Sequence, residues 1–247
     1  MEKDVSFSDL GMPFPLFDAP VKFAERFVRN GSCSICERAS LPVFELGIGS
    51  DVVYPCTNCG SDTIFDKSGE GEVKCASCGS WQIAPVDLEE SVQSCYDCLR
   101  SGKAAITQDT EFGMVRLEDA QRGWTHGTPH LEATSYQLRT GQDGWVQVKI
   151  DTDRLLDLVR TPSYSTWQGV RWLFCCGGPM TYLGEWNQQD FCKHAVDGDG
   201  AKLFEQMSGD FRADSWTFDD LESRFPGKIY AFRCTACEGK RLNADME

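Results

Sequence analysis

The 247-residue chain has no long hydrophobic run, and nothing in it approaches the roughly 20 apolar residues that a membrane-spanning helix needs. This absence argues against a transmembrane protein. The opening stretch, MEKDVSFSDL, is acidic and polar, and it has neither the basic nor the apolar region of a signal peptide. We therefore expect a cytoplasmic protein that makes no membrane contact.

Basic residues are also scarce. The chain has 24 Lys and Arg against 38 Asp and Glu, which gives a formal net charge of −14. Proteins that bind nucleic acid need a basic face for the phosphates, so this balance argues against that class. The acidic residues cluster locally, at Asp87, Glu89, Glu90, Asp151, Asp153, Asp157, Asp210, Asp214, Asp219, Asp220 and Glu222. They form either a solvated surface or a patch that attracts a basic protein partner.

Common catalytic motifs are missing as well. The chain contains no Gly-rich phosphate loop, no His-Glu-x-x-His motif and no nucleophile elbow. Cys192, His194 and Asp197 are neighbours in sequence, but residues at such short offsets on a loop rarely face one another as a triad requires. His126 and His130 flank a loop rich in glycine and proline, where isolated histidines are usually surface or hydrogen-bonded core groups. We therefore expect a protein that is not an enzyme.

Cysteine, in contrast, is abundant. Five Cys-x-x-Cys pairs account for most of the thirteen cysteines: Cys33/Cys36, Cys56/Cys59, Cys75/Cys78, Cys95/Cys98 and Cys234/Cys237. Two intervening residues allow a turn to direct both sulfurs at one point, and two such turns complete a tetrahedral zinc site. The odd count, the spacing and the expected cytoplasmic location favour metal ligands over disulfides.

The expected zinc ions are structural. Four soft thiolates in a closed tetrahedron select zinc over harder ions and leave no open coordination position. Such a site contributes folding free energy and does no chemistry. An iron site of the rubredoxin type uses similar turns and is the alternative.

Glycine distinguishes the two middle pairs, because Gly60 and Gly79 follow them directly. Glycine accepts the positive φ that a metal-binding turn needs. The sequence therefore predicts a self-contained zinc ribbon over 54–81, with strands at 62–66 and 71–75 joined by a turn at 67–71.

The outer pairs lack this glycine, which favours a nested grouping. In that grouping Cys56 and Cys59 share a site with Cys75 and Cys78. The remaining site of this region then holds Cys33, Cys36, Cys95 and Cys98. The gaps between successive pairs are 15 to 19 residues and suit either arrangement. Grouping in sequence order is therefore the alternative.

The last pair, Cys234/Cys237, needs partners from elsewhere in the chain. We expect strand 171–176 beside strand 228–234, because both lead into cysteines, and Gly177-Gly178 allows the chain to turn. Cys176 is then the third ligand and Cys175 the fourth.

Cys192 or His194 is the alternative fourth ligand of this C-terminal site. If only Cys176, Cys234 and Cys237 bound the ion, a water could take the open position, as in zinc enzymes. This arrangement is the enzymatic alternative.

The remaining pattern predicts an α+β fold of short antiparallel strands and a few helices. Helices are expected at 21–28, at 153–160 after a cap at Asp151 or Thr152, at 201–207, and at 218–225 after Thr217. The helix at 153–160 should bury Leu155, Leu156 and Val159. A hairpin is expected at 133–140 and 144–150, and a strand–turn–strand around 177–179. Residues 99–131 and most of 187–215 read as irregular.

Three blocks of the sequence resemble a known family. TPSYSTWQGVRWLFCCGGPMTYLG (161–184) is similar to the central motif of the CbrC family (UPF0167) of small bacterial cytosolic proteins. IYAFRCTAC (229–237) resembles the family's closing strand and cysteine pair. CSIC (33–36) and SCYDCLRSGKAA (94–105) resemble its opening pair and a following segment.

The resemblance implies that Cys56–Cys78 is an insertion between family blocks. It therefore supports the nested grouping, with a CbrC-like zinc-binding domain at 1–53 and 82–247 and the ribbon at 54–81. The sequence departs from the pattern at Gly178, where an acidic residue is usual, and at Glu238, where glycine is usual. The hairpin at 133–150 is an addition. These departures bear on the ligands of the C-terminal site.

The family name refers to tolerance of a colicin, a bacterial toxin, and the resemblance implies no enzymatic activity. Inhibitors of nuclease toxins are commonly acidic because they cover a basic face. We therefore expect a non-enzymatic zinc protein that binds and neutralises a protein partner, a basic toxin domain. A zinc enzyme and a nucleic-acid-associated ribbon are the alternatives.

Overall fold

The computed structural model describes residues 4–69, 71–131, 135–208, 217–223 and 226–246. The fold is α+β, as predicted, with short antiparallel strands and few helices. The chain divides into two compact units. We call Ala24–Ser163 the central unit because it is the middle of the sequence. We call Met1–Phe23 together with Tyr164–Glu247 the outer unit because it contains the two ends of the sequence.

None of the helices in the described ranges has the length and apolar character that a membrane-spanning helix requires.

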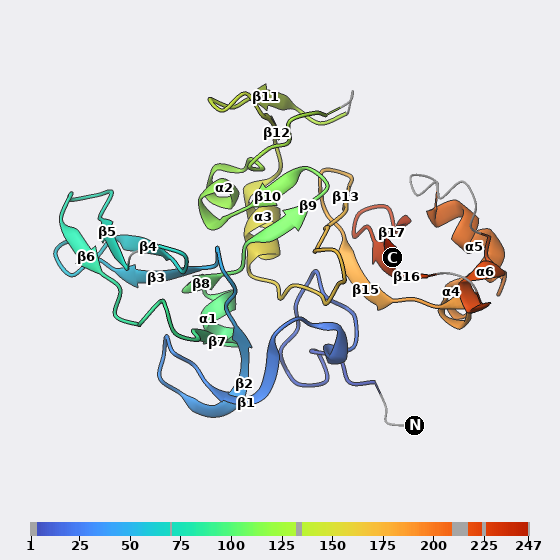
Figure 1. Cartoon of the computed structure of the whole chain (residues 1–247), viewed down its shortest axis with the longest axis horizontal. Helices are drawn as coiled ribbons and strands as arrows, with labels where there is room; N and C mark the ends of the chain where they lie inside the picture. The colour runs from blue at the N-terminus through green and yellow to red at the C-terminus, as the bar shows by residue number, and fades with distance from the viewer. Residues whose placement is uncertain (1–3, 70, 132–134, 209–216, 224–225, 247) are drawn as a thin grey trace. The chain divides into compact units, whose positions relative to one another are not determined.

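The central unit is built mainly from hairpins (Figure 1). Its elements are β1 (Phe27–Ser32), β2 (Ala39–Glu45), β3 (Asp51–Pro55), β4 (Asp62–Asp66), β5 (Glu72–Lys74), β6 (Trp81–Ile83), β7 (Gln93–Cys95), α1 (Tyr96–Arg100), β8 (Ala104–Ala105), β9 (Gln108–Thr110), β10 (Gly113–Val115), α2 (Leu117–Arg122), β11 (Leu138–Thr140), β12 (Val146–Val148) and α3 (Thr152–Val159).

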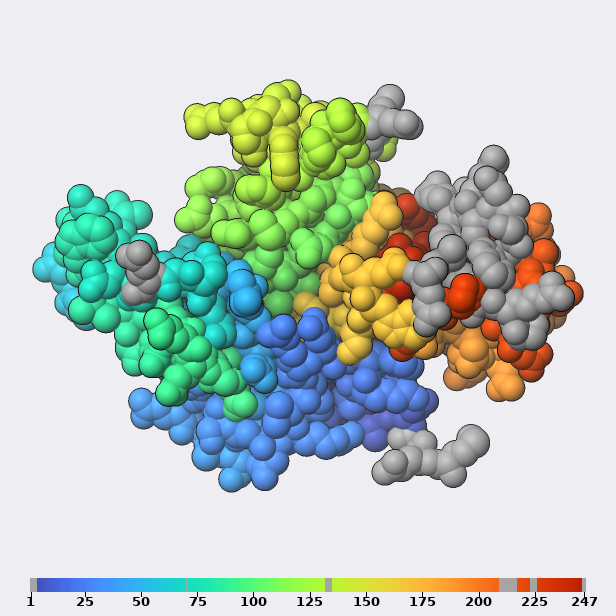
Figure 2. Space-filling model, viewed as in Figure 1, coloured from blue at the N-terminus to red at the C-terminus, as the bar shows by residue number. Residues whose placement is uncertain are grey.

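The predicted ribbon contains the expected strands, but their pairing differs from a simple hairpin across 67–71. β4 pairs with β3, and β5 pairs with β6, so each strand pairs across its own cysteine turn. β3 also pairs with β8, which ties the first hairpin to the rest of the central unit. Figure 2 shows the segment from β3 to β6 in cyan and green on the surface of this unit. The inserted domain at 54–81 stays a prediction.

Two predictions for the first half of the chain are wrong. The helix at 21–28 is a single 3-10 turn, η1 (Val21–Phe23), followed by β1. Arg26 has a φ of 55°, which ends helical geometry, and β1 pairs with β2, where Phe27 lies opposite Phe44. The segment 99–131 is not irregular, because it contains β9, β10 and α2.

The outer unit contains one larger sheet and three helices among its described residues (Figure 1). Besides η1, its elements are β13 (Phe174–Cys175), β14 (Gly178–Pro179), β15 (Thr181–Glu185), α4 (Gln188–His194), α5 (Gly200–Met207), α6 (Asp220–Ser223), β16 (Gly227–Arg233) and β17 (Lys240–Met246).

β16 is the middle strand of the order β15–β16–β17 and is buried on both faces. Its alternate residues Ile229 and Ala231 pack with Trp186, Phe191 and the helices α4 and α5. On the opposite face an aromatic cluster contains Tyr164, Trp172, Tyr182, Tyr230 and Phe232. Opposite orientation of successive side chains in a strand places these two sets on separate faces. The outer unit therefore has a substantial core of its own.

Several later elements agree with the sequence. α3 begins at its predicted cap, where Asp151 accepts hydrogen bonds from the backbone N–H groups of Asp153 and Arg154. Its buried face uses Leu158 in place of Leu156. β11 and β12 form the predicted hairpin, although 132–134 lie outside the described residues. α5 lies where expected, and α6 is a single turn within the predicted 218–225.

Two features of the outer unit differ from expectation. The strand beside β16 is β15, whereas Cys175 belongs to a short hairpin of β13 with β14. α4 occupies part of the segment expected as a loop. Asn187 caps this helix, and the Asp190 carboxylate in turn accepts from the Asn187 N–H, so a local capping box stabilises a polar sequence.

Candidate metal centres

The structure brings twelve of the thirteen cysteines together in three groups of four. The groups are Cys33, Cys36, Cys95 and Cys98; Cys56, Cys59, Cys75 and Cys78; and Cys175, Cys176, Cys234 and Cys237. Within each group all sulfur atoms lie within 4.8 Å of one another. We call them the opening site, the ribbon site and the C-terminal site. The grouping is the nested one.

The sulfur spacing fits a tetrahedral metal ion. A zinc–thiolate distance of about 2.3 Å places the sulfurs of a tetrahedron about 3.8 Å apart. The Sγ–Sγ distances are 3.6 and 3.7 Å in the ribbon site, 3.8 Å for two pairs in the opening site and 3.7 Å for two pairs in the C-terminal site. None of the cysteines forms a disulfide. The donor sets therefore match the size of a bound zinc ion.

The ribbon site consists of two similar turns at the ends of two hairpins. In the first, the Gly60 N–H donates to the Cys56 carbonyl at 2.8 Å, and in the second the Gly79 N–H donates to the Cys75 carbonyl at 2.9 Å. Gly60 and Gly79 have φ values of 75° and 73°, as the sequence predicted. The strands that flank each turn hold its two sulfurs toward the shared centre.

The same turn recurs in the other two sites without glycine. The Glu37 N–H donates to the Cys33 carbonyl at 2.9 Å, and the Glu238 N–H donates to the Cys234 carbonyl at 3.1 Å. Glu37 and Glu238 adopt φ values of 59° and 57°, a left-handed conformation that costs a residue with a β-carbon about 1–2 kcal/mol. The metal-binding turn is therefore kept at an energetic cost where glycine is absent.

The second half of the opening site comes from α1. Cys95 is the N-cap of this helix and Cys98 lies in its first turn. The Arg38 guanidinium donates to the sulfurs of Cys36 and Cys95 at 3.4 and 3.2 Å, and it forms an ion pair with Asp97 at 2.6 Å. A cation beside four thiolates offsets part of their negative charge, a role that the sequence did not reveal.

The second half of the C-terminal site is the β13–β14 hairpin. Cys175 ends β13, and Cys176 and Gly177 form its turn with φ values of 49° and 83°. Two successive positive φ values are typical of tight two-residue hairpins. This turn is why adjacent cysteines can both face Cys234 and Cys237. Cys192 and His194, the alternative ligands, lie outside the group.

Hydrogen bonds favour the thiolate form of one or more cysteines in each group, whereas burial raises the pKa of Cys33, Cys98 and Cys175. The Ser80 hydroxyl, then Asn58, lower the pKa of Cys78 to about 5. Burial raises the pKa of Cys36, but hydrogen bonds from Arg38 outweigh it and bring this pKa to about 6. Burial also opposes ionisation of Cys234, whose pKa still falls to about 7 because backbone N–H groups of Cys237 and Ala236 donate to its sulfur.

Burial differs among the sites. In the opening site three of the four cysteines are buried, whereas the ribbon and C-terminal sites each expose two. In the C-terminal site the exposed pair is Cys176 and Cys237. Each site nevertheless supplies four thiols, which is the number that a closed tetrahedral centre needs.

The fold and the three cysteine groups define an α+β protein with three four-cysteine centres. The profile of the Uncharacterised protein family (UPF0167) matches residues 65–246, and the chain belongs to this family. The matched stretch contains eight of the twelve clustered cysteines and begins within the ribbon.

A UPF0167 protein of Pseudomonas aeruginosa is 29% identical over 91 residues. This match covers 35% of the present chain, and it spans about half, 48%, of the relative's length. No solved structure matches the chain.

Proposed function

We propose that the protein is a non-enzymatic binding protein, braced by structural zinc, that captures a basic protein partner. The observation that carries this proposal is the presence of three complete four-thiol groups with tetrahedral spacing. Closed sites of this kind stabilise a fold and leave no open position for substrate. A braced surface is pre-organised, which lowers the entropic cost of binding.

Zinc is the proposed ion because thiolates are soft ligands and closed four-thiolate sites are typical of structural zinc. The twelve cysteines named above would hold it. The zinc-enzyme alternative needs an open coordination position beside Cys176, Cys234 and Cys237. The Cys175 thiol lies in the same group and would fill that position, which argues against this alternative. Cobalt substitution tests this point, since four-thiolate spectra at every site would exclude an open centre.

The acidic clusters are not equally available to a partner. Asp151 caps α3, Asp157 pairs with Arg100 at 2.7 Å, and Asp220 accepts from the Thr217 hydroxyl at 2.7 Å. Asp210 and Asp214 lie outside the described residues. Glu89, Glu90, Asp219 and Glu222 are exposed. Charge reversal is informative at these four residues, because it leaves the helix caps intact.

We place the interface on β6, at the end of the ribbon, and on the segment that follows it. Trp81 and Ile83 project from β6 with 70% and 73% of their surface exposed, and Glu89 and Glu90 follow in the next segment. Large apolar anchors are typical of interface centres, and carboxylates beside them would attract a positively charged partner. The toxin identity, suggested by family resemblance, and the cytoplasmic location both stay predictions.

The test begins with a partner captured by the full-length chain and identified, whose affinity is then measured with purified proteins. Trp81→Ala should weaken binding at least about tenfold, because exposed tryptophans are frequent energetic anchors. Glu89→Lys with Glu90→Lys should slow association and reduce its salt dependence.

The matched control reverses Asp219 and Glu222, which belong to the outer unit, and should leave association unchanged. If only this control variant slowed association, the interface would lie on the outer unit. A partner with an acidic face, or one that all three variants bind equally well, would contradict the proposal.

A further inference from the structure

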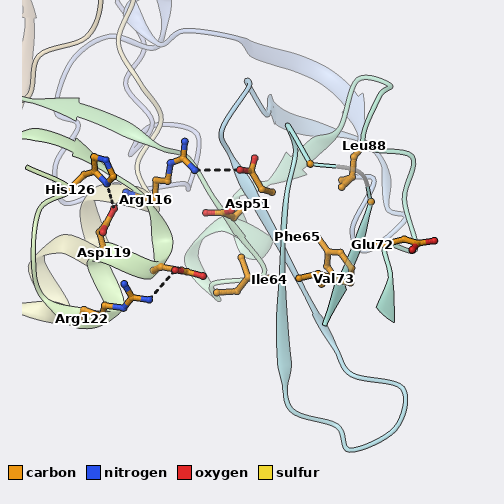
Figure 3. A pocket seen from close by; sticks show the side chains of 14 residues that line it. Asp51, Ile64, Phe65, Glu72, Val73, Leu88, Arg116, Asp119, Arg122 and His126 are labelled. Atoms are coloured by element: carbon orange, nitrogen blue, oxygen red, sulfur yellow. Dashed lines mark hydrogen bonds and ion pairs between the residues drawn. The ribbon is translucent and has the colours of Figure 1, made fainter. Parts of the chain in front are cut away.

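A cleft of roughly 430 Å³ lies in the central unit, and no cysteine is among its lining residues. Figure 3 shows its two walls. One wall carries the apolar side chains Phe65, Val73 and Leu88, and the other carries Arg116, Asp119, Arg122 and His126. Ile64 shares a face of the β3–β4 hairpin with Asp51, opposite to the face of Phe65. Asp51, on β3, lies between them.

Carboxylates outnumber cations in this cleft. Its lining contains two arginines, Arg116 and Arg122, and five carboxylates: Asp51, Asp66, Glu72, Glu118 and Asp119. Each arginine already has a carboxylate: Arg116 lies 3.5 Å from Asp66, and Arg122 lies 3.0 Å from Glu118. Among the residues that the structure describes, no arginine or lysine forms an ion pair with Asp51.

The charges are also arranged by depth. The side chains of Arg116 and Arg122 are 44% and 63% exposed, so the guanidinium groups lie at the rim. The side chain of Asp119 is only 13% exposed, and Asp51 is 7% exposed. The floor of the cleft is therefore acidic.

Asp51 is held at the floor by its backbone and by one backbone hydrogen bond. It lies opposite Asp66 in the β3–β4 pair and receives a hydrogen bond from the Leu117 N–H at the start of α2. Burial, and then the charge of Asp66, raise the pKa of Asp51 to about 7, although Leu117, and then Arg116, act in the opposite sense. A buried carboxylate without a paired cation lowers stability, and an asparagine would fill the same space at a smaller cost.

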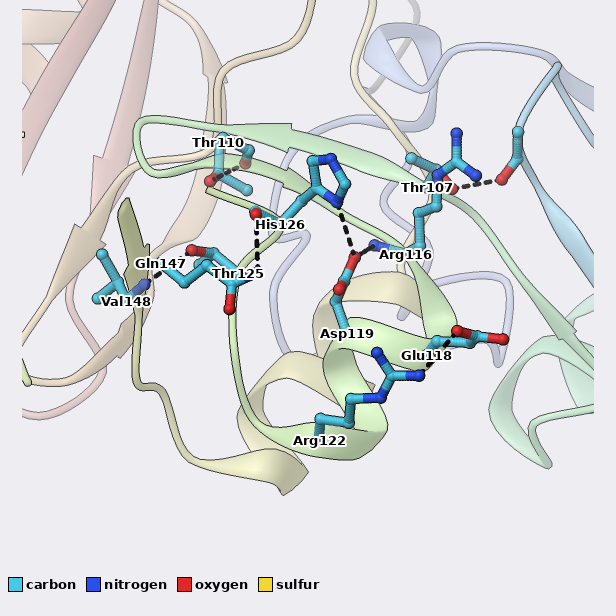
Figure 4. Close-up of polar contacts among 12 residues, drawn as sticks. Thr107, Thr110, Arg116, Glu118, Asp119, Arg122, Thr125, His126, Gln147 and Val148 are labelled. Atoms are coloured by element: carbon cyan, nitrogen blue, oxygen red, sulfur yellow. Dashed lines mark hydrogen bonds and ion pairs between the residues drawn. The ribbon is translucent and has the colours of Figure 1, made fainter. Parts of the chain in front are cut away.

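Hydrogen bonds hold the residues of the polar wall in place (Figure 4). The Asp119 carboxylate accepts from the Arg116 N–H at 3.3 Å and lies 3.9 Å from Nδ1 of His126. The His126 backbone donates to the Met114 carbonyl at 2.8 Å and accepts from Nε2 of Gln147 at 3.0 Å. The acidic groups are therefore positioned before any ligand arrives.

The spacing of these carboxylates does not suit a metal ion. Among the described residues, the three cysteine groups are the only sets of three or more candidate ligands within 4.8 Å. Carboxylates that are spread more widely suit a larger cation. The apolar side chain of Ile64, on the same face of the hairpin as Asp51, suits an aliphatic chain.

We propose that this cleft binds an organic cation, an alkyl-ammonium or guanidinium group, at Asp51 and Asp119, with its aliphatic part against Ile64. The cation supplies the counter-charge that Asp51 lacks. The cation has two possible sources. One is a lysine or arginine side chain of the basic partner, which rests on the proposed function. The other is a free amine, which does not.

The experiment follows backbone amide shifts of the intact metal-loaded protein during titration. The probe is N-acetyl-lysine methylamide, and its uncharged control is N-acetyl-norleucine methylamide. The lysine derivative should bind with saturable shifts at residues 51, 64–66 and 116–119. The neutral derivative should bind at least about tenfold more weakly, because it cannot pair with the carboxylates.

Two variants are expected to act in opposite directions. Asp51→Asn should weaken binding of the lysine derivative about tenfold or more. Arg116→Gln should strengthen binding, since it removes a competing cation from the cleft. Asp62→Asn, an exposed substitution at the far end of the same β3–β4 hairpin, is the matched control and should change nothing. A merely structural defect would weaken binding in both cleft variants.

Protonation gives an independent readout. Cation binding should release a proton from Asp51 at pH 7, so the calorimetric enthalpy should depend on the ionisation enthalpy of the buffer. This dependence should vanish in Asp51→Asn. The groups that face Asp51 are Asp66 on β4, Arg116 before α2, and Glu118 on α2.

The proposal is overturned if the neutral derivative binds equally well, if Asp51→Asn binds the lysine derivative as tightly as the native chain, or if magnesium or calcium causes the same shifts. If the lysine derivative binds but Asp51→Asn leaves capture of the protein partner intact, the source is a free amine. In that case the partner-binding proposal is unaffected.

Discussion

The ribbon site and the C-terminal site present the same four thiols, yet they are built differently. In the ribbon, two equivalent turns carry glycine at the strained position, and few buried apolar side chains surround them. In the outer unit, one such turn meets an unrelated hairpin beside a sheet with buried side chains on both faces. We therefore expect the ribbon to depend on a bound metal ion, whereas the outer unit has a core that can form without one.

The largest expected effect is that of metal removal. When a chelator strips the protein at neutral pH, amides in β3 to β6 should lose most of their protection from hydrogen exchange. β15 to β17 should keep theirs. Structural zinc contributes on the order of 10 kcal/mol to small metal-dependent domains, and the ribbon has little else to replace it. Hydrogen exchange read by mass spectrometry measures both regions in one sample.

Restoring zinc should restore the protection in the ribbon. Equal loss of protection in the two regions would show that the outer unit also depends on metal, and the contrast between them would disappear.

The next effect concerns the ligands of the C-terminal site. Cys176→Ser should reduce metal content by one equivalent in the presence of a competing chelator, because an alcohol is a poor substitute for a thiolate. Cys192→Ser is the control and should retain all the metal. Elemental analysis after gel filtration measures the metal content of both variants. If only the Cys192 variant lost metal, Cys192 and not Cys176 would be a ligand of the C-terminal site.

A smaller effect is expected from pH, and it belongs to the central unit. The unfolded chain ionises Asp51 near its ordinary pKa of 3.8, whereas the folded chain keeps the proton until about pH 7. Stability should therefore fall as pH rises from about 4 to 7 and then level off, by at most about 4 kcal/mol from this residue.

Asp51→Asn removes this contribution, so its melting temperature should exceed that of the native chain at pH 8 and approach it at pH 5. Asp62→Asn should behave like the native chain at both pH values. If Asp51→Asn and the native chain melted with the same pH dependence, Asp51 would not carry a raised pKa.

The smallest effect tests whether the turns are interchangeable. Glu238→Gly should stabilise the C-terminal site by up to about 1 kcal/mol, because glycine accepts a φ of 57° without strain. Glu238→Ala keeps the β-carbon and is the control. The native Glu238 side chain is 72% exposed, and its carboxylate lies 3.7 Å from the Arg233 guanidinium. The ion pair that both variants lose therefore contributes little.

Gly60→Ala should lower stability by a similar amount in the ribbon. Resistance to chelator and the melting temperature report both changes. Equal stability of the Gly and Ala variants at 238 would show that backbone strain at this turn has no energetic weight.

The features that were predictable from the sequence are local ones. The cysteine turns, the glycines at 60 and 79 and the Asp151 cap of α3 all rest on interactions across two to four residues. Elements that lacked such a signal were missed. α2 has an arginine at its N-cap, and β9 and β10 are only three residues long.

The candidate sites divide in the same way. The glycines at 60 and 79, together with the family resemblance, favoured the nested grouping, and Cys175 and Cys176 were the preferred partners of Cys234 and Cys237. However, the expected route, a strand directly beside β16, is wrong, because β15 takes that place. Arg38 could not be recognised as a neighbour of the opening site, because its contacts with Cys95 and Asp97 span nearly 60 residues.

The sequence by itself determined the chemistry of this protein. It contains five thiol pairs with metal-ligand spacing, a strong acidic excess and local signals for most of its turns. Only the tertiary structure decided which cysteines share a centre, which acids are exposed, and that Asp51 is buried opposite Asp66 in a cleft. The physical reason is that burial and electrostatic environment depend on contacts between residues far apart in the chain, whereas turns and caps depend on neighbours.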